Sequence, residues 1–211
     1  MPVTVGAAEA LLVVDVQHDF LPGGALAVPD GDAVVAPIRA LAARFRTLVL
    51  TQDWHPAGHV SFASAHPGRA PFETVRLAYG EQVLWPDHCV QGSAGAGLAP
   101  GLDLPGAALV LRKGLSPGVD SYSAFVEADG TPTGLAGYLR ERGVRRVVLC
   151  GLATDYCVAW SALDARAAGF AAAVVADATR AIDQGGSLAA AWARMEAAGI
   201  GRATSADVTG S

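Results

Sequence analysis

A cysteine stands at the start of a helical stretch, directly after an apolar run. The run RRVVLCG, residues 145–151, is typical of a buried strand, and DYCVAWSALDARAAG, residues 155–169, is typical of a helix. Cys157 therefore lies in the first turn of that helix, where unpaired N–H groups and the positive end of the helix dipole lower a thiol pKa. The position favours a nucleophile over a buried structural cysteine.

The other two cysteines are expected to be structural. Cys150 lies inside the apolar run, and Cys89 follows a histidine in an irregular segment. Three cysteines in 211 residues, an odd and low count, do not indicate a disulfide framework.

Reactive side chains follow four apolar runs of the chain. Asp15 ends the first run, Asp53 follows the second and Lys113 ends the third. Cys157 comes just after the fourth. In open α/β sheets, ligands bind beyond the carboxyl ends of the strands. The four side chains are therefore expected to converge on one edge of the sheet.

An Asp-x-His pair follows the second run. Asp53 and His55 are two residues apart on an extended segment, so their side chains point to the same side. With His88 from the WPDHC segment they would form a three-ligand metal site with open positions, as catalytic sites require; scattered surface histidines are the alternative. Spacing leaves any further ligand open, the candidates being His59, Ser61, Ser64, His66 and water.

Strands and helices must alternate to position these residues. Five apolar runs are continuous rather than alternating, which is typical of strands buried on both faces of a parallel sheet. They cover residues 10–16, 47–52, 107–113, 145–151 and 171–177. Helical spacing covers residues 32–45, 134–143, 155–169 and 187–199. The pattern predicts an α/β fold with right-handed βαβ units, in which helices cover both faces of a three-layer, doubly wound, mainly parallel sheet.

One long segment, roughly residues 53–106, has little periodicity and is rich in Gly, Pro, His and Ser. A segment of this length without regular elements is unusual unless it is functional. The chain shows no internal repeat and no linker, so we expect a single domain over residues 1–211. The tail, residues 203–211, is expected to be frayed.

Composition limits the class of partner. The chain is 52% hydrophobic and 17% charged, with a net charge of −5 and no block of lysine or arginine, so we expect no nucleic acid partner. The N-terminal sequence has no basic region, and its apolar stretch is too short to span a bilayer. We therefore expect a cytoplasmic protein with no membrane partner; a homo-oligomer stays open.

Five segments, in this order, resemble the nicotinamidases, a family of isochorismatase-like cysteine hydrolases. They are DVQHDFLPGGALAV, DWHPAGHVSFAS, WPDHCVQGSAGA, RKG at 112–114, and GLATDYCV. The similarity spans about residues 10–183. The Asp, Lys and Cys positions are common to the wider superfamily, whereas DWHP together with WPDHC marks its metal-containing nicotinamidase branch.

The resemblance implies a catalytic triad and an oxyanion hole. Cys157 would be the nucleophile, Asp15 the general base and Lys113 the third member. The family's cis peptide bond would lie between Leu152 and Ala153. The backbone N–H groups of Ala153 and Cys157 would then face the substrate oxygen.

The resemblance also implies a metal and an aromatic pocket. Asp53, His55 and His88 would hold one divalent ion per chain, with zinc expected first and iron or manganese as alternatives. Three aromatic residues are similar to the pocket walls of the family, namely Phe20, Trp85 and Tyr122.

The implied reaction converts nicotinamide to nicotinic acid and ammonia, a step of NAD salvage, with pyrazinamide as a second substrate. One alternative keeps the triad but acts on another small amide, a ureido compound or an isochorismate-like ether. Another is a non-catalytic metal- or ligand-binding domain. The Asp-x-His and WPDHC segments argue against a different substrate. The filled triad positions argue against a non-catalytic domain.

Overall fold

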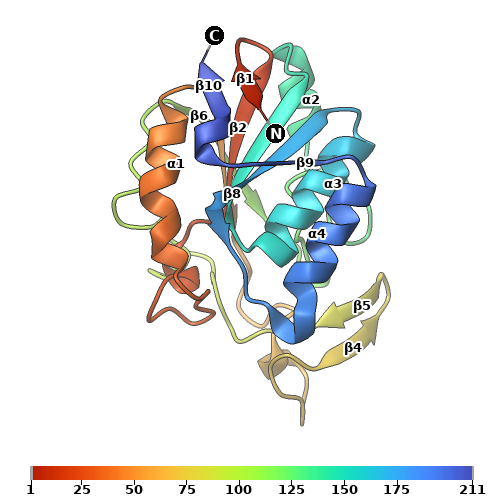
Figure 1. Ribbon diagram of the computed structural model, residues 1–211. Helices are drawn as coiled ribbons and strands as arrows, with labels where there is room; N and C mark the ends of the chain where they lie inside the picture. The colour runs from red at the N-terminus through yellow and green to blue at the C-terminus, as the bar shows by residue number, and fades with distance from the viewer. Residues whose placement is uncertain (1, 211) are drawn as a thin grey trace.

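A six-stranded parallel sheet forms the centre of the molecule, in the order β6-β3-β2-β7-β8-β9 (Figure 1). The structure is a computed structural model, and it describes residues 2–210. The strands are β2 (Glu9–Val14), β3 (Thr47–Asp53), β6 (Ala107–Lys113), β7 (Arg146–Leu152), β8 (Ala171–Arg180) and β9 (Gly201–Ala203). The first five lie at the five apolar runs, and every neighbouring pair is parallel, so the predicted parallel sheet is confirmed.

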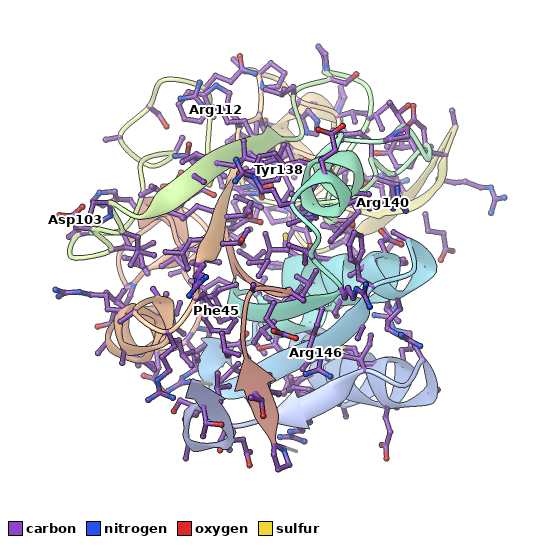
Figure 2. The ribbon with its side chains drawn as sticks, turned by 90° about the horizontal axis from the view of Figure 1, so that it is seen from above. Phe45, Asp103, Arg112, Tyr138, Arg140 and Arg146 are labelled. Carbon is purple, nitrogen blue, oxygen red and sulfur yellow. The ribbon has the colours of Figure 1, made fainter. Side chains whose placement is uncertain are left out.

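Helices cover both faces of the sheet. Figure 2, seen from above, shows α1 on one side of the sheet and the other three helices on the opposite side. The helices are α1 (Val35–Ala42), α2 (Leu135–Glu141), α3 (Ala159–Ala167) and α4 (Ser187–Ala197). Short helical turns are η1 (His18–Phe20), η2 (Gly31–Val34), η3 (Ala63–Ala65), η4 (Thr154–Val158), η5 (Gln184–Gly186) and η6 (Ser205–Asp207). The three-layer α/β architecture is therefore confirmed. None of the helices within residues 2–210 is long and apolar enough to cross a membrane.

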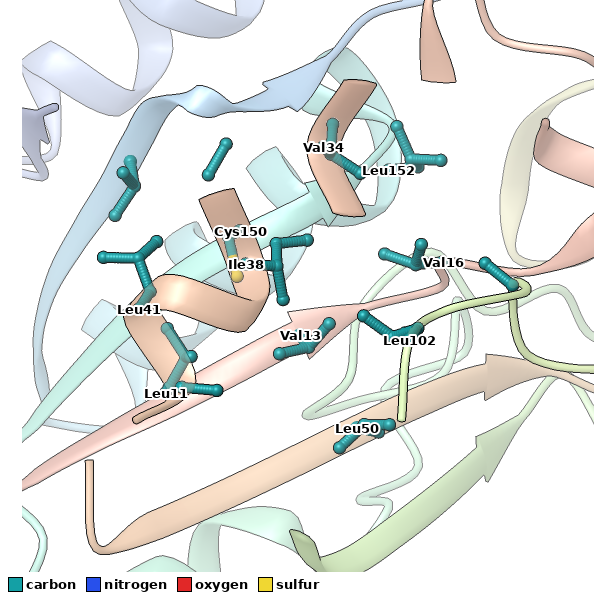
Figure 3. Close-up of a cluster of buried hydrophobic side chains, with 14 of the residues drawn as sticks. Leu11, Val13, Val16, Val34, Ile38, Leu41, Leu50, Leu102, Cys150 and Leu152 are labelled. Carbon is teal, nitrogen blue, oxygen red and sulfur yellow. The ribbon is translucent and has the colours of Figure 1, made fainter. Parts of the chain in front are cut away.

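Two apolar clusters hold the layers together, because side chains alternate along each strand. Leu11 and Val13 of β2 pack in the cluster that contains Ile38 of α1 (Figure 3). Leu12 and Val14 point to the opposite face, toward α2, α3 and α4. Burying one such side chain contributes about 1.5–3 kcal/mol. The central strand is thus fixed from both sides, and so is the position of the residue that follows it.

Two features of the fold differ from the sequence-based expectation. The irregular segment contains a hairpin, β4 (Thr74–Leu77) with β5 (Gly80–Val83). The tail is not frayed over residues 203–210, since β10 (Val208–Gly210) pairs in parallel with β1 (Val3–Val5). Both three-residue strands are too short to give a periodic signal, and fully buried Val3 and Val208 anchor them in the core. The last residue, 211, lies outside the described residues.

Candidate active site

The carboxyl ends of four adjacent strands bring four side chains together. Lys113 ends β6, Asp53 ends β3, Asp15 follows β2, and Cys157 follows β7. The reactive atoms of Asp15, Asp53 and Cys157 all lie within 4.8 Å of one another. Convergence arises because parallel neighbours end at the same edge of the sheet.

Lys113 lies at the centre of this group and is fully buried. Its Nζ is 2.9 Å from Asp15 Oδ2, also donates to Asp53 Oδ1, and lies 3.5 Å from Cys157 Sγ. The remaining contact is a hydrogen bond of 2.8 Å to the carbonyl oxygen of Ser121. Burial alone would lower the pKa of the ammonium, but the two carboxylates raise it well above its ordinary value. The lysine is therefore a permanent buried cation.

The two carboxylates differ in pKa. Burial raises the pKa of Asp15 above its ordinary value, although Lys113 opposes the shift. Burial acts on Asp53 in the same direction, but Lys113 and His55 outweigh it and hold the pKa of Asp53 well below its ordinary range. When their environments give two neighbouring carboxyl groups different pKa values, the two groups are suited to different roles in acid–base chemistry. Asp15 is suited to exchange a proton, whereas Asp53 stays ionised.

The thiol of Cys157 does not have the lowered pKa that we expected. Burial raises its pKa well above the ordinary value, and the attraction of Lys113 offsets only part of that shift. Residues 154–158 form a single π-helical turn before α3, and the side chain is 6% exposed. Desolvation thus outweighs the favourable helix start. A neutral thiol needs a base beside it, and Asp15 lies within reach.

Asp53 also belongs to a group of metal-ligand type. Its Oδ2 lies 3.6 Å from His55 Nε2 and 3.8 Å from His88 Nε2. The other ring nitrogen of each histidine faces a backbone carbonyl, Gly114 O at 3.1 Å and Pro86 O at 2.8 Å. If each Nδ1 donates to its carbonyl, both Nε2 lone pairs are free for a cation, which is the usual arrangement around metal-ligating histidines. The three residues therefore fit a divalent metal.

The close packing of His55 depends on a glycine. Gly114 has φ +66°, and a Cβ atom there would lie 2.4 Å from the His55 ring. Any other residue would displace the ring from Asp53. The RKG segment thus contributes both the buried cation and the space for a ligand.

The alternative ligands make other contacts. His59 Nδ1 is 2.7 Å from Ser61 Oγ, and its Nε2 is 3.1 Å from Val119 O. Ser64 donates to Asp87, and His66 Nε2 faces a carbonyl. A second trio within 4.8 Å, His55, His59 and Asp120, remains geometrically able to hold an ion.

Phe20, Trp85 and Tyr122 line one narrow cleft. Ala153 and Cys157 line the same cleft, and so do the three candidate metal ligands. The peptide bond between Leu152 and Ala153 is cis, as the resemblance implied. Aromatic walls of this kind suit a flat aromatic ligand held against the thiol.

Several contributing residues were not predicted from the sequence. Thr51 donates to Asp15 Oδ1 at 2.5 Å. The side-chain amide of Gln17 donates to the backbone carbonyl of Asp53 and accepts from the backbone N–H of Asp53, both at 2.8 Å. Thr51 stands two residues before Asp53 on one strand, so the period of two along β3 was an available signal. The cleft is also lined by Tyr156, where some members of the family that the sequence resembles have a histidine, and by three residues that the sequence did not single out, Leu26, Asp120 and Ile182.

Comparisons with a protein-family model and with known protein sequences agree on one family. The isochorismatase domain model matches residues 9–207. The chain is 56% identical over 200 residues to a nicotinamidase from Acinetobacter baylyi, with 94% of each chain covered. It is 44% identical over 205 residues to a nicotinamidase from Escherichia coli, covering 94% of this chain and 96% of the relative.

Solved structures show the same similarity. A nicotinamidase/pyrazinamidase from Acinetobacter baumanii superposes with a TM-score of 0.95 at 54% identity, covering 96% of this chain and 98% of that one. PnC1 from L. infantum, in complex with nicotinate, gives 0.88 at 42% identity over the full length of both chains. A pyrazinamidase of Pyrococcus horikoshii in complex with zinc gives 0.77 at 38% identity, covering 93% and 99%.

The two candidate trios can be told apart by substitution. His88 belongs only to the trio with Asp53, and His59 belongs only to the trio with Asp120. We expect His88→Ala to lose most of the bound metal and His59→Ala to retain about as much as the parent protein. Elemental analysis after dialysis against a weak chelator measures both. Retention in His88→Ala with loss in His59→Ala would assign the ion to the other trio.

Proposed function

This chain belongs to the isochorismatase family, and we infer that it hydrolyses the carboxamide of nicotinamide to nicotinic acid and ammonia. The observation that carries this conclusion is the meeting of a thiol, a carboxyl of raised pKa and a buried lysine beside an aromatic cleft. The similarity to nicotinamidases supports the choice of substrate. Pyrazinamide, a flat aromatic carboxamide of similar shape, is proposed as a second substrate.

We propose that Cys157 attacks the carboxamide carbon. An amide is a poor electrophile, and a thioester intermediate replaces one high barrier by two lower ones. Asp15 takes the thiol proton as the S–C bond forms, which fits its raised pKa and its place beside the sulfur. As the proton is transferred, the negative charge moves from Asp15 to the sulfur of Cys157. The Lys113 cation stabilises this charge in both positions.

The oxygen of the carboxamide becomes negative during the attack. We propose that the backbone N–H groups of Ala153 and Cys157 donate to it, because both residues line the cleft. A donor of this type is worth about 3–4 kcal/mol in other hydrolases. Asp15 then returns its proton to the departing nitrogen, so that ammonia leaves. Water hydrolyses the thioester and restores the thiol.

Asp53, His55 and His88 are proposed to hold one divalent metal ion. When bound, the ion would supply Lewis-acid affinity for a ring nitrogen and so favour pyridine-type amides. Zinc is the first candidate, because two imidazoles and a carboxylate suit it and a related pyrazinamidase was solved in complex with zinc. Iron and manganese are the alternatives.

We also propose a metabolic role and a cellular location for the enzyme. Cleavage of nicotinamide would serve NAD salvage by returning the ring as nicotinic acid. A cytoplasmic location is supported by the three free cysteines, one of which must stay reduced for catalysis.

Removal of the nucleophile gives the first test. We expect Cys157→Ala to lower ammonia release from nicotinamide at least ~10³-fold, because the residual oxyanion contacts cannot replace covalent catalysis. Cys150→Ala is the matched control, since Cys150 is also buried but lies inside β7 and does not line the cleft. It should keep substantial activity. Activity of Cys157→Ala above a few per cent would contradict the assignment.

Benzamide tests the choice of substrate. It has the same amide and nearly the same size as nicotinamide, but it lacks the ring nitrogen. Phe20 and Trp85 can contact either ring, so the apolar contribution is retained. A site built to bind a polar group of its substrate discriminates by ~10⁴-fold or more against an analogue that lacks this group. We expect kcat/KM for benzamide to be lower by this order on one metal-loaded preparation. Comparable values would show that the ring nitrogen is not recognised.

A further inference from the structure

The wall of the cleft is held by a residue that does not itself line it. Gln82 lies on β5, in the hairpin at the lower end of the molecule, where the carboxyl ends of the strands meet (Figure 1). We propose that Gln82 is a positioning residue that fixes Tyr122, and through it Trp85, against the substrate ring. The inference rests on the proposed function and names a further determinant of substrate affinity at that site.

The orientation of the Gln82 amide is set by its partners. The side chain is 1% exposed, and Tyr79 donates its hydroxyl proton to Oε1 at 2.9 Å. On the other side, Nε2 donates to Asp120 Oδ2 at 2.6 Å and to Val83 O at 2.7 Å. Both are acceptors, so the amide nitrogen must face them. This fixes the donor edge of the amide toward the cleft.

The same nitrogen reaches the tyrosine of the cleft. Tyr122 Oη lies 3.2 Å from Gln82 Nε2, whose two hydrogens are shared among this hydroxyl, Asp120 and Val83. The same oxygen accepts a hydrogen bond of 2.9 Å from Trp85 Nε1. The indole N–H can only donate, so the Tyr122 hydroxyl is the shared acceptor that joins the two. Trp85 and Tyr122 line the cleft, and so does Asp120. The buried amide of Gln82 therefore contacts Asp120 and Tyr122 of the cleft wall directly, and Trp85 through Tyr122.

Packing around Tyr122 is incomplete, although its ring contacts Trp85 and Tyr156. A cavity of about 300 Å³ borders this residue, lined by Tyr122 and Gln82 together with Glu127 and Trp160. A side chain beside empty space has few contacts to keep it in one rotamer. The hydrogen bonds from Gln82 and Trp85 therefore act together with these ring contacts to hold Tyr122 in place. Without Gln82, one of these restraints is lost and the ring has room to shift toward the cavity and away from the substrate.

The effect should appear in binding rather than in chemistry. Gln82 contacts none of the three triad residues, whereas Tyr122 and Trp85 face the ring-binding cleft. Loss of one hydrogen bond to a wall residue should raise KM for nicotinamide roughly 5- to 10-fold, with kcat changed less than about 2-fold. The inhibition constant of nicotinate as product should rise in parallel.

The test is Gln82→Met, which keeps length and apolar volume but removes the amide. Ammonia release from nicotinamide by the parent enzyme is measured first. Its absence would contradict the proposed function itself, whereas the variants test only the role of Gln82. Gln184→Met is the matched control, because Gln184 is exposed in η5, and it should leave KM unchanged. Tyr79→Phe is a milder second variant that removes only the partner of Oε1. It should raise KM about 2-fold.

A double-variant comparison separates positioning from general loss of structure. Tyr122→Phe removes the shared acceptor, so adding Gln82→Met to it should raise KM by less than Gln82→Met does alone in the parent. Unchanged KM in both Gln82→Met and Tyr79→Phe would overturn the proposal. A fall in kcat at constant KM would also overturn it, because that result would place the effect on Lys113 through Asp120 and Ser121.

Discussion

Lys113 places a positive charge in the protein interior, where it is stable only because Asp15 and Asp53 lie against it. Moving an ion out of water costs several kcal/mol, and close opposite charges must offset that cost. Each carboxylate in turn depends on the lysine. The three charges form one unit, and the loss of any member would leave the others uncompensated.

This unit joins two chemically different halves of the site. Asp15 faces the thiol of Cys157, while the second oxygen of Asp53 faces the histidines. The lysine therefore links the position of the proposed nucleophile to the position of the proposed metal ligands. The fold makes the connection short, because β6, β3 and β2 are neighbours and end at the same edge. A substrate ring bound beside the three proposed ligands would thereby face the sulfur.

The sequence predicted the parallel sheet and the meeting of side chains at its edge, because buried strands and strand-end polar residues are local signals. It did not predict the raised pKa of Cys157, since desolvation depends on atoms from distant segments. The β4–β5 hairpin was missed because its strands have four residues each and only Gln82 among them is buried. The role of Gln82 was hidden for the same reason, as its partners Asp120 and Tyr122 are about forty residues away.

The most direct test of the central charge is the unfolding free energy of Lys113→Met, compared with the parent after both are freed of metal by a chelator. Breaking a buried charge group by removing one partner costs about 3–5 kcal/mol, so we expect a deficit of that size at pH 7. Without the cation the folded-state carboxyl pKa values rise, so the deficit should shrink as the pH falls toward about 4, where protonation removes the unpaired charge. Adding Asp15→Asn should recover part of the loss. A variant as stable as the parent at pH 7 would contradict the account.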